Sequence, residues 1–173
     1  MTPFSGPIFA RRVAASLATG ALFTTLVAAA PVQQKASHKG WPVIDGSTII
    51  NHDDQSQPLQ GVADKHNELL GGHGDDTITA GDAGDVMWGD YKASGQPTTQ
   101  KDVITGGAGK DFIYASHGTN TIVTGGGADQ VHAHFGRGTI TCATKKPLIF
   151  LSHRSQKKYK LHGCTRITFR SSL

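Results

Sequence analysis

The stretch Gly106-Gly107-Ala108-Gly109-Lys110-Asp111-Phe112-Ile113-Tyr114 is the clearest copy of a nine-residue repeat that runs from Gly71 to about Phe150. A large apolar residue stands at the eighth position of each copy, and from Ile104 onward it returns every nine residues without a slip. These residues are Ile78, Met87, Ile104, Ile113, Ile122, Val131, Ile140 and Ile149. A fixed period of this length is typical of solenoids, in which each repeat stacks on its neighbours.

Aspartate occupies the sixth position of the first repeats and is replaced by other residues in most of the later ones. The sixth residues are Asp76, Asp85, Asp102, Asp111, Asn120, Asp129, Gly138 and Pro147. The surrounding glycines allow positive φ and bring several carbonyl oxygens close to one point, where the aspartate adds charged oxygen. Such hard oxygen ligands suit calcium better than a transition metal. Because unliganded carboxylates would repel one another, we expect calcium binding to be part of folding.

The motif Gly71-Gly72-His73-Gly74-Asp75-Asp76-Thr77-Ile78 resembles the hemolysin-type (RTX) calcium-binding repeat nearly residue for residue, and the resemblance covers Leu69–Ile140. It implies an all-β, right-handed parallel β-roll or β-solenoid. Two repeats would make one turn, and calcium would lie between loops stacked on the same side. The implied calcium ligands are Asp76, Asp85, Asp102, Asp111 and Asp129, with the glycines Gly72, Gly74, Gly107, Gly109 and Gly126.

The stacking order depends on one irregularity, because Met87 and Ile104 are separated by more than one period. We interpret residues 90–100 (DYKASGQPTTQ) as a loop that bulges out of the array, since their Gly, Pro and Thr content is loop-like. Alternate repeats then stack in two series. One series is Asp85, Asp111 and Asp129, and the other is Asp76, Asp102, Asn120 and Gly138. If the insertion instead forms half a turn, Asp85 pairs with Asp102, and Asp111 pairs with Asp129 and Asp76.

The N-terminus has the pattern of a secretory signal peptide, residues 1–29. Arg11-Arg12 is a short basic region, Val13–Ala30 is apolar and rich in small residues, and Pro31 begins a polar stretch. We expect Sec-dependent export with cleavage after Ala29, which makes the protein secreted, extracellular and not integral to the membrane. The alternative is an uncleaved membrane anchor. Type-I-secreted RTX proteins lack such a signal, so the expected export route differs from theirs.

The mature chain is predicted to be one small domain. We assign residues 30–40 to a linker, 41–70 to an N-terminal cap with irregular first coils, 71–141 to the calcium-binding repeats, and 142–173 to a basic C-terminal cap. Solenoid ends need caps because they would otherwise expose apolar surface and strand edges. The alternative for the segment at Trp41 is a flexible tail.

The two cysteines, Cys142 and Cys164, predict a disulfide in an exported chain. Cys142 begins the last repeat, which has lost its glycines and its aspartate. A covalent bond would therefore constrain the turn that calcium can no longer hold. Thiol catalysis is less favoured, because no orienting group is evident beside either cysteine.

Charge is unevenly distributed, since residues 142–173 contain no Asp or Glu while the chain has a formal net charge of +4. This basic segment has two explanations. It either docks on an anionic cell-wall polymer or on lipid headgroups, or it is a solvated edge that deters end-to-end association. Nucleic-acid binding is not expected, because export and the lack of interleaved stacking aromatic residues count against it.

The outward residues of the two series differ. One face is a threonine ladder, which resembles the faces of ice-binding solenoids, although threonine is also an ordinary strand residue. The other is an aromatic stripe, which is either a partner surface or is covered by the C-terminal segment or the 90–100 loop. The ladder is Thr77/Thr79, Val103/Thr105, Thr121/Val123 and Thr139/Thr141, and the stripe is Val86/Trp88, Phe112/Tyr114, Gln130/His132 and Leu148/Phe150.

Catalytic signatures are not evident in the sequence. The pair His132 and His134 lacks the H-E-x-x-H spacing of a metalloprotease, and no phosphate loop or nucleophile–base pair stands out. We therefore predict a secreted calcium-binding module with a structural or binding role at the cell exterior, and not an enzyme. The alternatives are a protein that adheres to a cell wall or a protein partner and, more distantly, an ice-binding protein.

Overall fold

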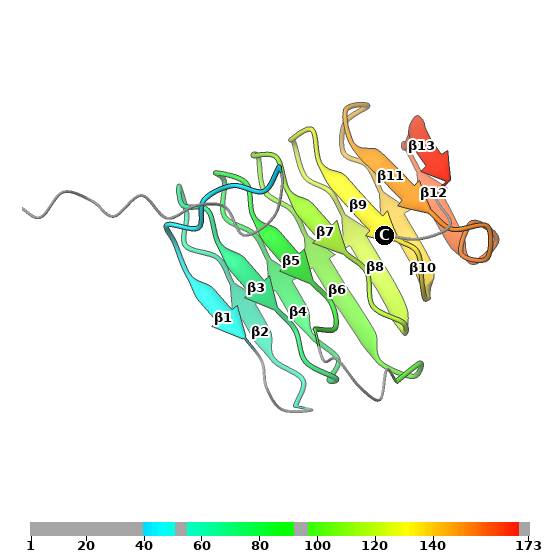
Figure 1. The fold of residues 1–173 in the computed structure, drawn as a ribbon, viewed down its shortest axis with the longest axis horizontal. Coiled ribbons are helices and arrows are strands. Elements are labelled where there is room, and N and C mark those ends of the chain that lie inside the picture. The colour runs from blue at the N-terminus through cyan, green and yellow to red at the C-terminus, as the bar shows by residue number, and fades with distance from the viewer. Residues whose placement is uncertain (1–39, 51–54, 92–96, 170–173) are drawn as a thin grey trace, which may run out of the picture. The chain divides into compact units, whose positions relative to one another are not determined.

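The computed structural model describes residues 40–50, 55–91 and 97–169, which form β-strands and connecting loops (Figure 1). The predicted signal peptide, and the predicted linker up to residue 39, lie outside the described residues. No helix that could span a membrane occurs in the described part of the chain. The strands are β1 (Thr48–Ile50), β2 (Pro58–Gln60), β3 (Glu68–Leu70), β4 (Thr77–Thr79), β5 (Val86–Trp88), β6 (Lys101–Thr105), β7 (Phe112–Tyr114), β8 (Thr119–Val123), β9 (Gln130–Ala133), β10 (Arg137–Thr141), β11 (Leu148–Leu151), β12 (Tyr159–His162) and β13 (Arg166–Phe169).

The strands form two parallel sheets that face each other. The odd-numbered strands make a seven-stranded sheet in the order β1-β3-β5-β7-β9-β11-β13, and the even-numbered strands make a six-stranded sheet. Each strand therefore pairs with the strand two positions along the chain, so two repeats complete one turn. This arrangement confirms the predicted all-β parallel β-solenoid.

The eighth residue of each repeat fills the space between the sheets. Strand register stacks Met87, Ile113, Val131 and Ile149 in one row, and the opposite row is built in the same way from the six-stranded sheet. The side chains at the eighth position of all eight repeats are 0 % exposed. Burial of each contributes about 1.5–3 kcal/mol, which makes the narrow core the main apolar contribution to stability.

The described residues of the insertion, 90–91 and 97–100, belong to neither sheet. Met87 pairs with Ile113 and Ile78 pairs with Ile104, so the turn before the insertion and the turn after it are direct neighbours. These registers confirm the stacking order predicted for a loop that bulges out of the array. They place Asp85 next to Asp111, and Asp76 next to Asp102.

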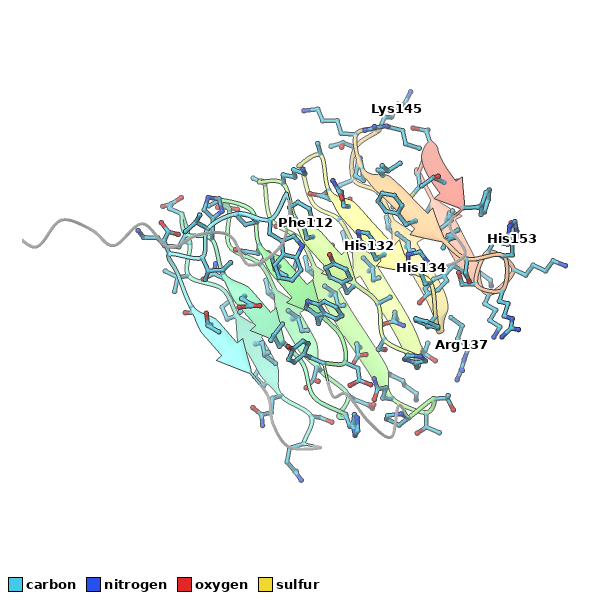
Figure 2. All side chains as sticks on the ribbon, in the orientation of Figure 1. Phe112, His132, His134, Arg137, Lys145 and His153 are labelled. Atoms are coloured by element: carbon cyan, nitrogen blue, oxygen red, sulfur yellow. A yellow bond between two sulfur atoms is a disulfide. The ribbon has the colours of Figure 1, made fainter. Side chains whose placement is uncertain are left out.

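The aromatic stripe forms a stacked ladder on the outer face of the seven-stranded sheet (Figure 2). Ring centroids are 4.1 Å apart between Trp88 and Tyr114, 4.7 Å between Tyr114 and His132, and 4.5 Å between His132 and Phe150. Trp41 packs on the front of this ladder and donates a hydrogen bond from Nε1 to the Tyr114 hydroxyl (3.1 Å). Trp41 thus contacts the outer face of the seven-stranded sheet, where it packs with Val86 and Phe112.

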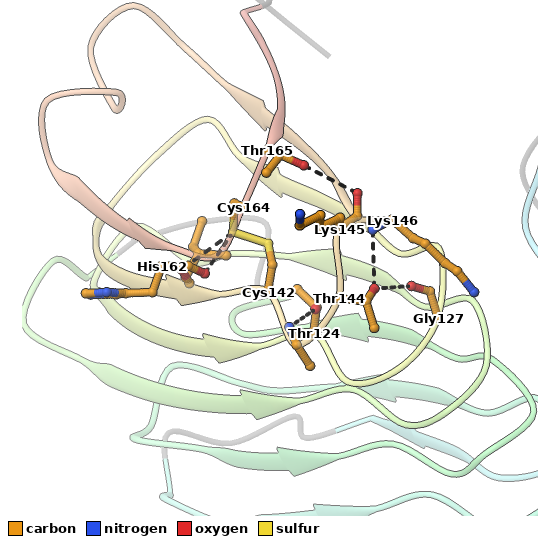
Figure 3. Close-up of a disulfide and its surroundings, with 11 residues drawn as sticks. Thr124, Gly127, Cys142, Thr144, Lys145, Lys146, His162, Cys164 and Thr165 are labelled. Carbon is orange, nitrogen blue, oxygen red and sulfur yellow. Dashed lines mark hydrogen bonds between the residues drawn. A yellow bond between two sulfur atoms is a disulfide. The ribbon is translucent and has the colours of Figure 1, made fainter.

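The C-terminal segment continues the solenoid. Strand β12 pairs with β10 and β13 pairs with β11, so the last turn extends both sheets. A disulfide joins Cys142 to Cys164 across 22 residues, as the sequence predicted (Figure 3). By the chain-entropy model, closing a loop of this length contributes roughly 3 kcal/mol.

Candidate metal site in two columns of stacked loops

The loops that connect the two sheets stack into two columns. We call the loops that precede β3, β5, β7, β9 and β11 the first column, and the loops that precede β4, β6, β8, β10 and β12 the second column. The sixth residue of each repeat lies at the end of its loop or in the first residues of the strand that follows. The parallel register therefore places sixth residues of the same column one above another.

Three aspartates form a continuous ladder in the first column. Asp85, Asp111 and Asp129 are each 0 % exposed. The backbone N–H of Asp85 donates to Oδ1 of Asp111 (2.7 Å), and the N–H of Asp111 donates to Oδ1 of Asp129 (2.9 Å). The other oxygen of Asp111 accepts a hydrogen bond from the N–H of Gly107 (2.8 Å). Each carboxylate is thus fixed in orientation by its own loop and by its neighbour.

Burial disfavours the ionised form of three of the predicted carboxylate ligands, Asp102, Asp111 and Asp129. Burial raises the pKa of Asp111 to about 7, and the charges of Asp129 and Asp85 add to the shift. In the second column, burial raises the pKa of Asp102 to about 7. Burial also raises the pKa of Asp129. A cation held between the loops would offset this penalty, because a nearby positive charge stabilises carboxylate.

Glycines let the backbones of successive loops approach closely. A Cβ at Gly107 would collide with the carbonyl oxygen of Gly81, and one at Gly109 would collide with the backbone at Ala83. Gly126 is less crowded, and its N–H donates to the carbonyl of Gly107 (2.8 Å). The first column therefore brings carbonyl oxygens of adjacent turns to the buried carboxylates.

The second column contains one aspartate pair. The N–H of Asp76 donates to Oδ1 of Asp102 (3.1 Å), and both side chains are 1 % exposed. Gly72 and Gly74 lie in the loop that ends at Asp76, where a Cβ at Gly74 would meet the backbone at Gln55. All predicted site residues therefore lie in the two columns, divided between them as the stacking order requires.

Asp90 is an acidic neighbour that the repeat pattern did not identify. It lies outside the nine-residue frame, at the start of the insertion, yet it is 8 % exposed and its charge contributes to the raised pKa of Asp102. Nε2 of His73 lies 3.7 Å from Oδ1 of Asp90. The second column thus gathers three carboxylates, from Asp76, Asp90 and Asp102, on two adjacent turns.

The donors present fit a calcium ion. Oδ2 of Asp102 and Oδ2 of Asp129 are buried and accept no hydrogen bond within the described residues. The same part of the chain holds no group of three or more His, Cys, Asp and Glu side chains placed to bind a metal by themselves. A cation here would therefore need backbone carbonyls as well as carboxylates. A mixed set of carboxylate and carbonyl oxygen is the set that calcium prefers.

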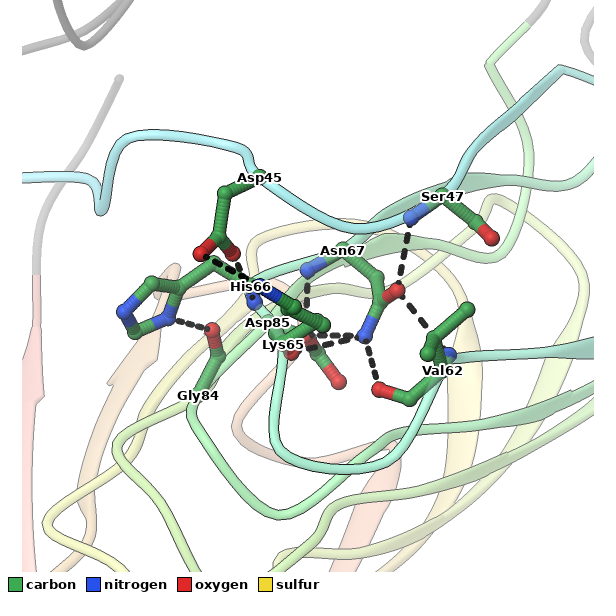
Figure 4. A network of polar contacts seen from close by, with 8 residues as sticks. All are labelled: Asp45, Ser47, Val62, Lys65, His66, Asn67, Gly84 and Asp85. Atoms are coloured by element: carbon green, nitrogen blue, oxygen red, sulfur yellow. Dashed lines mark hydrogen bonds and ion pairs between the residues drawn. The ribbon is translucent and has the colours of Figure 1, made fainter. Parts of the chain in front are cut away.

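The amide of Asn67 lies at the N-terminal end of the first column, next to Asp85 (Figure 4). Nδ2 of Asn67 donates to the carbonyls of Val62 (3.0 Å) and Lys65 (2.8 Å) and to Oδ1 of Asp85 (2.9 Å). Its Oδ1 accepts hydrogen bonds from the N–H groups of Ser47 and Val62. The amide hydrogens thus satisfy two carbonyls and a carboxylate, which are the same kinds of acceptor that would surround a cation.

A second asparagine closes the second column beyond Asp102. Nδ2 of Asn120 donates to the carbonyl of Ser116 and to the hydroxyl of Tyr159, both at 3.1 Å. The Tyr159 hydroxyl in turn donates to the carbonyl of Phe135 (2.9 Å), and burial raises its pKa. Neutral hydrogen-bond donors therefore occupy this level of the second column.

The far end of the first column is closed by covalent and side-chain contacts (Figure 3). Next to the disulfide, the hydroxyl of Thr144 donates to the carbonyl of Gly127 (3.5 Å), and Nη1 of Arg166 donates to the carbonyl of Lys146 (2.6 Å). Pro147 replaces the aspartate in this loop. No carboxylate is required to hold this turn.

The comparison with protein families agrees with the geometry. Residues 64–90 and 98–131 match the model of the RTX calcium-binding nonapeptide repeat in four copies. No curated protein and no solved structure matches the chain significantly. The matched segments contain the three aspartates of the first column and the Asp76–Asp102 pair of the second. Over these residues the chain consists of calcium-binding repeats of the RTX, or hemolysin-type, family.

Proposed function

We propose that the protein is a secreted module whose solenoid is stabilised by calcium ions bound between stacked loops. The observation that carries this proposal is the ladder of buried aspartates in the first column. Three carboxylates on successive turns, each 0 % exposed, form an arrangement that would destabilise the fold without a compensating cation. Calcium would supply that charge and would cross-link adjacent turns.

Three intervals between turns have the required donors. In the first column they lie between Asp85 and Asp111 and between Asp111 and Asp129, and in the second between Asp76 and Asp102. The glycines Gly107, Gly109, Gly126, Gly72 and Gly74 would let backbone carbonyls reach these positions. We assign no site to the levels of Asn67 and Asn120, because their amides already donate to the oxygens there.

The cell exterior is the proposed location. Arg11-Arg12 and the apolar segment Val13–Ala30 have the pattern of an export signal, and the Cys142–Cys164 disulfide fits an oxidising compartment. Extracellular calcium concentrations suit modules with Kd values of about 10⁻⁴–10⁻³ M. We infer a structural or binding role and no catalysis, since the carboxylates of the repeat are assigned to the metal.

A calcium titration tests the proposal directly. We expect the protein in chelator to lack most of its β-structure, and to regain it cooperatively at about 10⁻⁴–10⁻³ M calcium, as followed by circular dichroism. Native mass spectrometry at the end point should detect three bound ions per chain under this assignment. Identical spectra and melting curves with and without calcium would refute the proposed role.

A further inference from the structure

An open groove lies at the C-terminal end of the second column, beyond the level of Asn120. Its volume is about 960 Å³, and its walls come from three successive loops together with Thr98. Its lining includes the cations Arg137, Arg154 and Lys158, the aromatic ring of Phe135, and the histidines His117, His134 and His153. Figure 2 shows Arg137 and His153 at this edge of the solenoid, whereas Lys145 lies at the opposite edge.

The groove carries positive charge that no carboxylate of the described residues neutralises. Its lining includes two arginines and a lysine but no acidic residue, and residues 130–173 contain no Asp or Glu. Within the described residues, no carboxylate pairs with Arg154 or Lys158. The side chain of Arg137 donates from Nη2 to the carbonyl of Thr98 (3.3 Å), which leaves most of the guanidinium donors available. Cations that converge from different turns on one groove favour an anionic ligand.

The walls of the groove are held in place before any ligand binds. The hydroxyl of Ser152 donates to the carbonyl of His134 (2.8 Å), and the N–H of Ser155 donates back to the Ser152 hydroxyl (3.0 Å). The Tyr159 hydroxyl fixes the neighbouring loop through the carbonyl of Phe135. Binding would therefore require little ordering of the backbone, which favours affinity.

One wall of the groove is an aromatic platform. The rings of His117 and Phe135 are stacked with centroids 4.4 Å apart, and Phe135 is 52 % exposed. An exposed aromatic ring next to cations suits a ligand that has both a flat apolar face and a negative charge. A sugar ring that bears a carboxylate or a sulfate has both properties. The disulfide fits the oxidising compartment proposed above, where polymeric anions are mainly glycans and not nucleic acids.

We propose that this groove binds an acidic polysaccharide, with Arg137, Arg154 and Lys158 holding its anionic groups and Phe135 packing against a sugar ring. The site does not include the aspartates of the calcium loops. A failure to bind polysaccharide would therefore not contradict the proposed calcium function, provided that the protein is folded in the assay.

The test compares three polymers with the same backbone: dextran sulfate, carboxymethyl-dextran and neutral dextran. Binding is measured by calorimetry to the purified, disulfide-bonded protein in calcium, at about 0.15 M salt so that diffuse charge effects are screened. We expect binding to at least one of the two anionic dextrans and none to neutral dextran. Absence of binding to both anionic polymers would overturn the proposal.

Matched variants locate the site. Arg154→Ala combined with Lys158→Ala should weaken binding about tenfold or more, since each removes a charged hydrogen-bond donor. Lys145→Ala combined with Lys146→Ala removes the same charge at the opposite edge and should change affinity less than about twofold. Phe135→Ala should weaken binding without any change in charge. Equal losses in the two double variants would show that only net charge matters, and would contradict the proposed groove.

Two further probes separate the ligand classes. A single-stranded DNA oligonucleotide and phosphatidylserine vesicles are titrated under the same conditions. We expect both to bind more weakly than the anionic dextran and to be insensitive to Phe135→Ala. Tighter binding of either probe, lost in the Arg154/Lys158 variant, would assign the groove to nucleic acid or to lipid and refute an acidic polysaccharide. Circular dichroism of every variant in calcium confirms that the fold is retained.

Discussion

Asp111 is the residue whose substitution tests the stacked-loop assignment most sharply. It lies between Asp85 and Asp129 in the first column, so it should serve the sites on both of its sides. Asp76 has one partner aspartate in its column, Asp102, and should serve one site. Asp111→Ala should therefore abolish two calcium sites, whereas Asp76→Ala should abolish one.

The expected difference follows from mass action. At about 10 mM calcium and a Kd of about 10⁻⁴ M, each occupied site stabilises the fold by about 2.7 kcal/mol. Asp111→Ala should then remove about 5 kcal/mol of calcium-dependent stability, and Asp76→Ala about half of that. The relevant quantity is the change in the free energy of unfolding between calcium and chelator, because both substitutions also remove hydrogen bonds that do not depend on calcium.

Two measurements read the outcome. Denaturant unfolding with and without calcium gives the difference in free energy, and native mass spectrometry counts the ions that remain bound. Asp129→Ala is the matched control, since Asp129 belongs to the same column but has Pro147 at the next level. Equal ion losses for Asp111→Ala and Asp129→Ala would refute the idea that the central aspartate is shared.

The remaining predictions concern pH, the disulfide and the closed end of the first column. The folded-state pKa of Asp102 and Asp111 is raised from 3.8 to about 7, so the metal-free fold binds extra protons and should gain stability as pH falls through 7. In chelator, circular dichroism should show more β-structure at about pH 5 than at about pH 8; a loss of structure on acidification would contradict this sign. Cys142→Ser should lower stability by roughly 2–5 kcal/mol even in saturating calcium and should make the chain after residue 142 the first segment cleaved by protease. Unchanged melting, or two free thiols in the unreduced protein, would argue against that role. Asn67→Asp should bind one more calcium ion than the parent, and an unchanged ion count would show that the amide is not standing in for a cation.

The repeat alone predicted the strand register on each side of the insertion at 90–100. This was possible because a strict period in buried residues such as Ile104 and Ile113 permits one register, and because a slip would expose the whole row. The insertion at 90–100 could be recognised from its turn-forming composition. Its effect on the stacking order was settled by the strand pairs, which the sequence left open.

Contacts outside the period could not be predicted in the same way. Trp41 has no repeat position, so nothing in the sequence indicated that it packs on Tyr114, 73 residues away. Tyr159 reaches Asn120 across 39 residues, and its place in the second column depends on the course of the last turn. The basic groove likewise combines loops from three turns, and composition showed only that the C-terminal segment was basic.

The two asparagines occupy the ends of the columns of bridging carboxylates, where a further cation would lack a second carboxylate. A carboxylate inside the column shares its oxygens between two levels, but a terminal one would face a level with no partner charge. At the front of the first column, Asn67 meets Asp85 with N–H groups and so satisfies that outward oxygen without a cation. In the second column, Asn120 is the next sixth-position residue after Asp102, and its amide donates to the hydroxyl of Tyr159 and not to a carboxylate. Under the proposed assignment, neutral donors occupy these end levels, so the number of bound ions would depend on where asparagine replaces aspartate and not on the number of turns in the solenoid.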